Sequence, residues 1–147
     1  MVNVRNIPDK MTAKRAGGPA LKKPDRTVVL VDDDDDMVSA LSEALEEEGY
    51  RVYAAFDGKE AYELLRGIRA PLAIILDLMM PVMDGWRLID LIDTDPDMAK
   101  IPKFVITSAR TAVTQSLVGL PIFVKPLRVD DVLRALKTFE PPPASSY

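Results

Sequence analysis

Residues 72–85 of this chain have the sequence LAIILDLMMPVMDG, and this stretch decides the fold. It begins with the apolar run Leu72–Leu76 and continues into a segment that contains Pro81 and Gly85. A short apolar run bounded by loop residues is typical of a buried strand in a parallel sheet. The stretch therefore predicts a buried strand that presents the carboxylate of Asp77 at its C-terminal end.

Three further apolar runs end in the same way, each at a charged or hydroxyl residue. They are Val28–Val31 before Asp32 and Asp33, Phe104–Ile106 before Thr107, and Ile122–Val124 before Lys125 and Pro126. In an open parallel sheet, ligands bind in the crevice outside the carboxyl ends of the strands. Acids, a hydroxyl and a lysine at that edge predict a site for one divalent cation and one phosphoryl group.

Helical patterns separate these strands and one more strand candidate, Arg51–Ala55. Apolar residues recur at helical spacing from Met37 to Leu45, after Asp57, after Asp84, and from Val132 to Phe139. Because β-α-β crossovers force parallel pairing with helices on both faces, we expect an α/β fold, a doubly wound five-stranded parallel sheet sandwiched by helices. We expect one domain at residues 26–140, between a basic N-terminal tail (1–25) and a C-terminal tail (141–147).

The composition excludes several classes of chemistry. The chain of 147 residues contains no cysteine and no histidine. Disulfides, thiolate catalysis, histidine-ligated metals and a phosphohistidine of its own are therefore excluded. The carboxylates that are present are suited to Mg²⁺, Mn²⁺ or Ca²⁺.

The charge distribution does not indicate that the domain binds nucleic acid, and the apolar stretches do not indicate that it inserts into a membrane. The net charge is −4, whereas residues 1–25 carry six basic and two acidic residues together with two glycines and three prolines. That composition is typical of a flexible, solvated tail, and the alternative is a contact with an acidic partner or nucleic acid. No apolar stretch approaches about 18 residues and no secretory signal is present, so the cytoplasm is the default location.

The four strand-end motifs together resemble the receiver domain of two-component response regulators. They are V-D-D after the first strand, D-x-x-M-P-x-M-D-G from Asp77, Thr107 after the fourth strand, and Lys125-Pro126 after the fifth. The resemblance covers about Arg26 to Phe139 and implies the flavodoxin-like receiver fold.

The resemblance also implies a role for each residue of the site. Asp77 is the phosphoacceptor, which takes its phosphoryl group from a phosphohistidine on a sensor histidine kinase or a histidine phosphotransfer protein. Mg²⁺, for which Mn²⁺ can substitute, is held by Asp77, by Asp33 directly, by Asp32 largely through water, and by the backbone carbonyl of Met79.

Two further residues act on the phosphoryl group according to the same resemblance. Lys125 is the counter-charge to its oxygens, and Thr107 is the switch hydroxyl that moves inward when the group arrives. Only Glu140 to Tyr147 follow the final helix, so we expect a stand-alone regulator without a DNA-binding domain, which signals to a downstream protein partner. No enzyme activity is expected beyond its own phosphoryl transfer and slow autodephosphorylation.

The chain departs from the family pattern at several positions. Receivers usually carry an aromatic residue three positions before the lysine, where this chain has Ile122; Phe123 belongs to the opposite face of the strand. The segment between strands four and five is compressed, so we expect a short or irregular fourth helix. Met79 and Ala109 occupy positions that tune dephosphorylation and neither side chain can orient water, which predicts a long-lived phosphoryl group.

Three other interpretations compete with this one. A phosphorylation-independent scaffold would keep the fold without the switch, and Ile122 favours it. A haloacid-dehalogenase-like phosphatase would need a second acid where Met79 stands. Residues Asp32, Asp34, Asp36 and Glu43 match an EF-hand calcium loop, but Met37 occupies the position that requires glycine.

Overall fold

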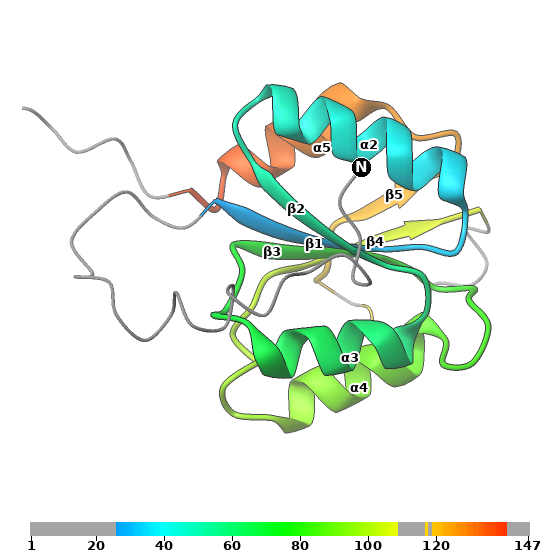
Figure 1. The fold of residues 1–147 in the computed structure, drawn as a ribbon, viewed down its shortest axis with the longest axis vertical. Coiled ribbons are helices and arrows are strands. Elements are labelled where there is room, and N and C mark those ends of the chain that lie inside the picture. The colour runs from blue at the N-terminus through cyan, green and yellow to red at the C-terminus, as the bar shows by residue number, and fades with distance from the viewer. Residues whose placement is uncertain (1–25, 109–116, 118, 141–147) are drawn as a thin grey trace, which may run out of the picture.

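The computed structural model describes residues 26–108, 117 and 119–140, and these residues form a five-stranded parallel sheet with four helices (Figure 1). The strands are β1 (Thr27–Val31), β2 (Arg51–Ala55), β3 (Ala73–Asp77), β4 (Lys103–Thr107) and β5 (Ile122–Val124). The helices are α2 (Asp35–Glu47), α3 (Gly58–Gly67), α4 (Gly85–Thr94) and α5 (Val129–Lys137). The predicted doubly wound sheet is confirmed.

The sheet order is β2-β1-β3-β4-β5, with helices on both faces. Figure 1 shows α2 and α5 on one face and α3 and α4 on the other. Each face carries its own hydrophobic core, because the strand residues alternate between the α2–α5 side and the α3–α4 side. The chain reverses its direction of winding between β1 and β3, which is where an α/β sheet opens a crevice.

Three of the helices begin at aspartates, which accept hydrogen bonds from backbone N–H groups of the first turn. Asp34 accepts from Asp36 and Met37, Asp57 from Glu60, and Asp84 from Arg87. These side chains satisfy N–H groups that have no partner within the helix. Among the acids after β1, Asp34 caps α2, and Asp35 and Asp36 lie in its first turn, where negative charge is favourable.

Strand β5 confirms the predicted alternation of its side chains. Ile122 packs against the α3–α4 core and Phe123 against the α2–α5 core. Phe123 lies 6.1 Å from Phe104, measured between ring centroids. The aromatic ring therefore cannot take the place of the residue at position 122.

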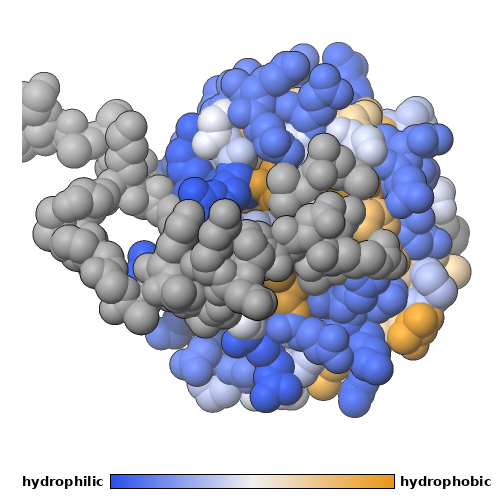
Figure 2. Space-filling model, in the orientation of Figure 1, coloured by the Kyte–Doolittle hydropathy of each residue, from blue (hydrophilic) through white to orange (hydrophobic). Residues whose placement is uncertain are grey.

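Some expectations fall on residues that the structure does not describe. The short fourth helix is expected between β4 and β5, where residues 109–116 and 118 lie outside the described residues, as do both tails. Among the described helices, none is long and apolar enough to cross a membrane. Figure 2 shows largely hydrophilic residues on the outer surfaces of the helices.

Candidate functional site

Three carboxylates meet at the C-terminal edge of the sheet. Asp77 is the last residue of β3 and is 4% exposed, Asp32 directly follows β1 and is fully buried, and Asp33 is exposed. One carboxylate oxygen from each lies within 4.8 Å of the others. They meet because β1 and β3 are neighbours in register, with Val31 beside Leu76.

Lys125 brings a positive charge to two of these carboxylates. Its Nζ atom lies 3.0 Å from Asp32 Oδ2 and 3.4 Å from Asp77 Oδ2. The residue directly follows β5, and its backbone N–H donates to the carbonyl oxygen of Thr107 at 2.9 Å. Because β4 lies between β5 and β3, the long lysine side chain connects strands that are not neighbours.

Backbone N–H groups orient the two buried carboxylates. Asp32 Oδ1 accepts a hydrogen bond from Asp34 at 2.9 Å, and Asp77 Oδ1 accepts one from Met79 at 3.4 Å. Each donor lies two residues after its acceptor, so the turn that ends the strand also directs its carboxylate. The N–H group of Asp34 thus contributes to the site, which the sequence did not indicate.

For Asp32, Asp77 and Lys125, burial and the oppositely charged partner act on the pKa in opposite directions. Burial raises the pKa of both Asp32 and Asp77, although hydrogen bonds and Lys125 counteract it. Burial lowers the pKa of Lys125, but the two carboxylates outweigh that effect and leave it raised. The two buried carboxylates are therefore under-compensated, because burial outweighs their hydrogen bonds and the one lysine that they share.

The donor set fits a divalent cation. Three carboxylates against one lysine leave an excess of two negative charges. The buried Asp32 Oδ2 has the ion pair with Lys125 but no hydrogen bond of good geometry within the described part of the chain. Hard oxygen ligands of this kind suit Mg²⁺, and the exposed Asp33 leaves the site open to water on one side.

The structure also places Thr107 and Met79 at this edge. Thr107 is the last residue of β4 and is buried; in the register, Ile106 lies beside Asp77, so Thr107 is one residue further along. Met79 belongs to the loop after β3 and is 58% exposed. All the residues predicted for the site thus lie at the carboxyl ends of β1, β3, β4 and β5.

Gly85, to which the sequence assigned no role of its own, also shapes the site. Gly85 begins α4, and a Cβ atom there would collide with the carbonyl oxygen of Asp77 and lie 2.8 Å from the Cα atom of Leu78. The absence of a side chain lets α4 start directly against the end of β3. The Asp84-Gly85 pair was the only signal in the sequence, and it also suits an ordinary turn.

The family model of the response regulator receiver domain matches residues 28–137. The chain belongs to the response regulator receiver family. Receiver domains take phosphate from histidine kinases in two-component signalling, bind Mg²⁺ at an acidic site and are signalling domains rather than enzymes. The predicted family is confirmed.

Several relatives are similar to this receiver over most of its length. Response regulator GtcR of Aneurinibacillus migulanus is 35% identical over 95 residues, which are 65% of this chain and 37% of the relative. Transcriptional regulatory protein PrrA of Mycobacterium leprae is 34% identical, over 75% of this chain and 48% of the relative. The chain thus spans less than half the length of these two curated relatives.

Among solved structures, the chemotaxis response regulator CheY4 of Vibrio cholerae is 28% identical with a TM-score of 0.69. The match covers 77% of this chain and 97% of that structure. The similarity supports the receiver fold across nearly the whole of the compared domain.

Proposed function

We propose that this receiver accepts a phosphoryl group on Asp77 from a phosphohistidine of a sensor histidine kinase or phosphotransfer protein. The observation that carries the proposal is the position of Asp77 at the end of β3, with two carboxylates within 4.8 Å and Lys125 at 3.4 Å. We further propose that the protein signals through contacts with a downstream protein.

The chemical step needs a free carboxylate oxygen and compensation of charge. A carboxylate oxygen of Asp77 attacks phosphorus while the bond from phosphorus to the imidazole nitrogen breaks, and the electron pair stays on the imidazole. The product is an acyl phosphate on Asp77. Such transfer depends mainly on positioning and electrostatic stabilisation. The carboxylate of Asp77 meets the requirement for positioning, because it is buried and held by a hydrogen bond.

The acidic cluster supplies the proposed cation site. Asp33, Asp32, Asp77 and the backbone carbonyl of Met79 would hold Mg²⁺, or Mn²⁺ in its place. Mg²⁺, when bound, offsets the negative charge of the carboxylates and the incoming phosphoryl oxygens. The three clustered carboxylates support this assignment.

Lys125 and Thr107 are proposed to respond to the phosphoryl group. Lys125 would exchange its ion pair with Asp77 for phosphoryl oxygens, as a compact point charge on a flexible stem. Thr107 would donate its hydroxyl group to the phosphoryl group and move inward, which is the switch. Their positions beside Asp77 at the ends of β5 and β4 support these roles.

A phosphorylation-independent scaffold is the second candidate. It is favoured by Ile122, an aliphatic residue that packs on the α3–α4 side where receivers usually carry an aromatic residue. The phosphatase alternative is weaker, because Met79 holds the position of its second acid. The domain bounds 26–140 and the cytoplasmic location stay proposals.

The test is phosphorylation by a small donor. The purified chain is incubated with Mg²⁺ and acetyl phosphate, and intact mass spectrometry measures phosphoryl uptake. We expect one acid-stable, base-labile phosphoryl group on the wild type and none on Asp77→Asn. Asp84→Asn is the matched control, because asparagine also caps a helix and Asp84 lies only seven residues away.

Three outcomes would contradict the proposal. Equal phosphorylation of Asp77→Asn would place the phosphoacceptor elsewhere. No uptake by the wild type would favour the scaffold, and sustained release of phosphate from varied phosphate esters would favour the phosphatase.

A further inference from the structure

The loop between β3 and α4 begins directly after Asp77, its Leu78 is buried, and its Met80 and Met83 pack against the α3–α4 core. At its base, the N–H of Gly85 donates to the carbonyl oxygen of Leu78 at 2.9 Å. At its tip, the N–H of Met83 donates to Pro81 at 2.7 Å across Val82, whose φ of 66° is unfavourable for a β-branched residue. Val82 is also 78% exposed, so packing does not hold the tip in place.

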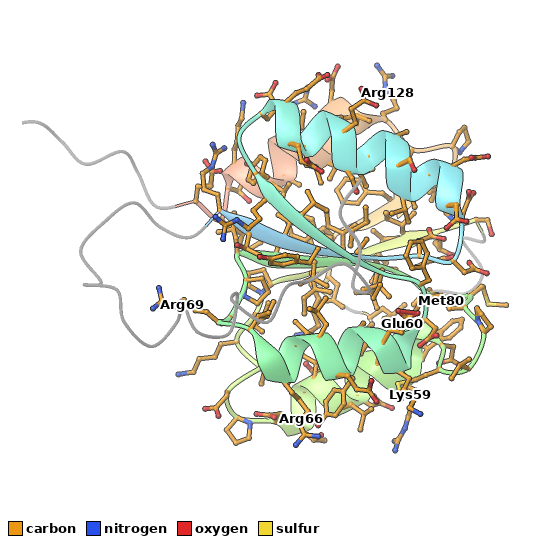
Figure 3. The ribbon with its side chains drawn as sticks, in the orientation of Figure 1. Lys59, Glu60, Arg66, Arg69, Met80 and Arg128 are labelled. Atoms are coloured by element: carbon orange, nitrogen blue, oxygen red, sulfur yellow. The ribbon has the colours of Figure 1, made fainter. Side chains whose placement is uncertain are left out.

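The start of α3 provides a backbone contact to this loop from another element. The N–H of Gly58 donates to the carbonyl oxygen of Met83 at 3.0 Å. This backbone hydrogen bond joins the loop to a part of the fold other than its own strand and helix. Figure 3 shows Met80 of the loop at the same end of the molecule as Lys59 and Glu60 in the first turn of α3.

The contact depends on the absence of a side chain at Gly58. A Cβ atom there would lie 2.5 Å from the carbonyl oxygen of Met83 and 2.9 Å from its Cγ atom. Those distances are shorter than real Cβ contacts, and the nearest obstacle is backbone rather than a flexible side chain. Any other residue at this position must therefore displace the loop or the start of α3.

We propose that Gly58 is a positioning residue for the phosphoacceptor site. It fixes the β3–α4 loop and thereby the direction of the Met79 backbone, whose N–H holds the carboxylate of Asp77 at 3.4 Å. The inference rests on the proposed function, because it concerns the same cation and phosphoryl site. It adds a residue on α3, nineteen positions before Asp77, that touches neither group itself.

The experiment compares the same substitution at two glycines of α3. Gly58→Ala adds a Cβ atom against Met83, whereas Gly67→Ala adds one with no atom within 4 Å. Mg²⁺ alone is titrated, and binding is followed by the fluorescence of Trp86, the single tryptophan of the chain, which follows Gly85 at the start of α4. Circular dichroism confirms that each variant is folded.

We expect Gly58→Ala to raise the Kd for Mg²⁺ about tenfold, as disturbed supporting contacts around metal sites do. Its phosphorylation by acetyl phosphate should slow, also at saturating Mg²⁺. Gly67→Ala should bind Mg²⁺ like the wild type and melt at a higher temperature, because alanine favours helix. An unchanged Kd in folded Gly58→Ala would overturn the inference, as would an equal loss in Gly67→Ala.

A measurement on the wild type decides the question even if Gly58→Ala does not fold. Hydrogen exchange of the Gly58 amide, which is bonded to the loop, should slow when Mg²⁺ is added. The Ala61 amide, which donates to Asp57 within α3, is the internal reference. Equal responses of the two amides would overturn the inference. A wild type that takes up neither Mg²⁺ nor phosphoryl group would overturn the proposed function, and the inference with it.

Discussion

Lys125 is the residue on which the charge balance of the site depends. It contacts Asp32 at 3.0 Å and Asp77 at 3.4 Å, and both carboxylates are buried. A carboxylate that is buried without a partner is costly, so a single cation shared between two acids stabilises both. Because Lys125 does not neutralise all the carboxylates of the site, a divalent cation can balance the remaining negative charge.

We predict that Lys125→Met lowers the free energy of unfolding by about 1–3 kcal/mol without Mg²⁺, because two buried acids lose their shared partner. Mg²⁺ should recover more stability in the variant than in the wild type, since the added cation compensates the same carboxylates. Urea unfolding with EDTA and with Mg²⁺ measures both effects. Lys137→Met, at an exposed lysine of α5, is the control, and an equal loss there would contradict the prediction.

A second prediction concerns Met79 and the lifetime of the acyl phosphate. Its exposed thioether beside Asp77 cannot orient an attacking water by hydrogen bonding, so the acyl phosphate should be long-lived. Met79→Asn should shorten that lifetime several-fold, whereas Val82→Asn in the same loop should not. Decay of the phosphorylated protein in Mg²⁺, followed by intact mass, is the measurement. A wild-type lifetime of seconds would argue against this role.

Lys103 joins β4 to α4 at the N-terminal ends of the strands, opposite the candidate site. It is the first residue of β4, is 7% exposed, and lies 2.9 Å from Asp93 near the end of α4. It also donates to the carbonyl oxygen of Ile101 at 3.3 Å. The ion pair therefore anchors the connection from α4 to β4, which was not evident from the sequence.

We predict that Asp93→Asn destabilises the protein more than Lys103→Met does. The first variant leaves a buried ammonium group without its acid, which costs about 1–3 kcal/mol, whereas the second removes the charge altogether. Chemical denaturation of both variants measures the difference. The reverse order of stability would show that the aliphatic stem of Lys103 matters more than its charge.

On the scale of the whole molecule, Arg26 connects the two ends of the described domain. Its Nη2 atom lies 2.9 Å from Glu140, after α5, and its Nη1 atom donates to the carbonyl oxygen of Glu48, after α2. Its guanidinium carbon also lies 4.2 Å from the centre of the Tyr50 ring. These contacts connect Arg26 to the segments that follow α2 and α5.

The contact to Glu140 should depend on pH in a defined direction. Tyr50 and Arg26 lower the pKa of the Glu140 carboxyl group. A lowered pKa in the folded state stabilises the fold above the usual glutamate value of about 4.3, and this contribution is lost as pH falls through the lowered pKa. Because the pair is partly exposed, we expect it to contribute less than about 1 kcal/mol.

The measurement compares wild type with Glu140→Gln across pH. Their difference in unfolding free energy should be the same at pH 7 and pH 5 and should shrink in more acidic solution. Glu63→Gln, at an exposed glutamate of α3, is the control for the substitution itself. A difference that grows on acidification would reverse the assigned sign.

How much of the fold and of the site the sequence predicts depends on how far apart in the chain the interacting residues lie. The apolar runs indicated β1, β3, β4 and β5, and Asp57 and Asp84 before helical patterns indicated the starts of α3 and α4, because both signals are local. The ion pair of Lys103 with Asp93 and the contact of Gly58 with Met83 gave no such signal. Each joins positions whose proximity depends on how two elements pack.

By itself, the sequence determined which residues end the strands, and therefore the chemistry available at that edge: acids, a hydroxyl group and a lysine. It also determined the opposite faces of Ile122 and Phe123, because side chains alternate along any strand. Only the tertiary structure decided that Lys125 reaches Asp32 and Asp77 across β4, and that the N–H of Gly58 contacts Met83 of the β3–α4 loop. The reason is physical, since strand order and helix packing set distances between residues that are far apart in the chain.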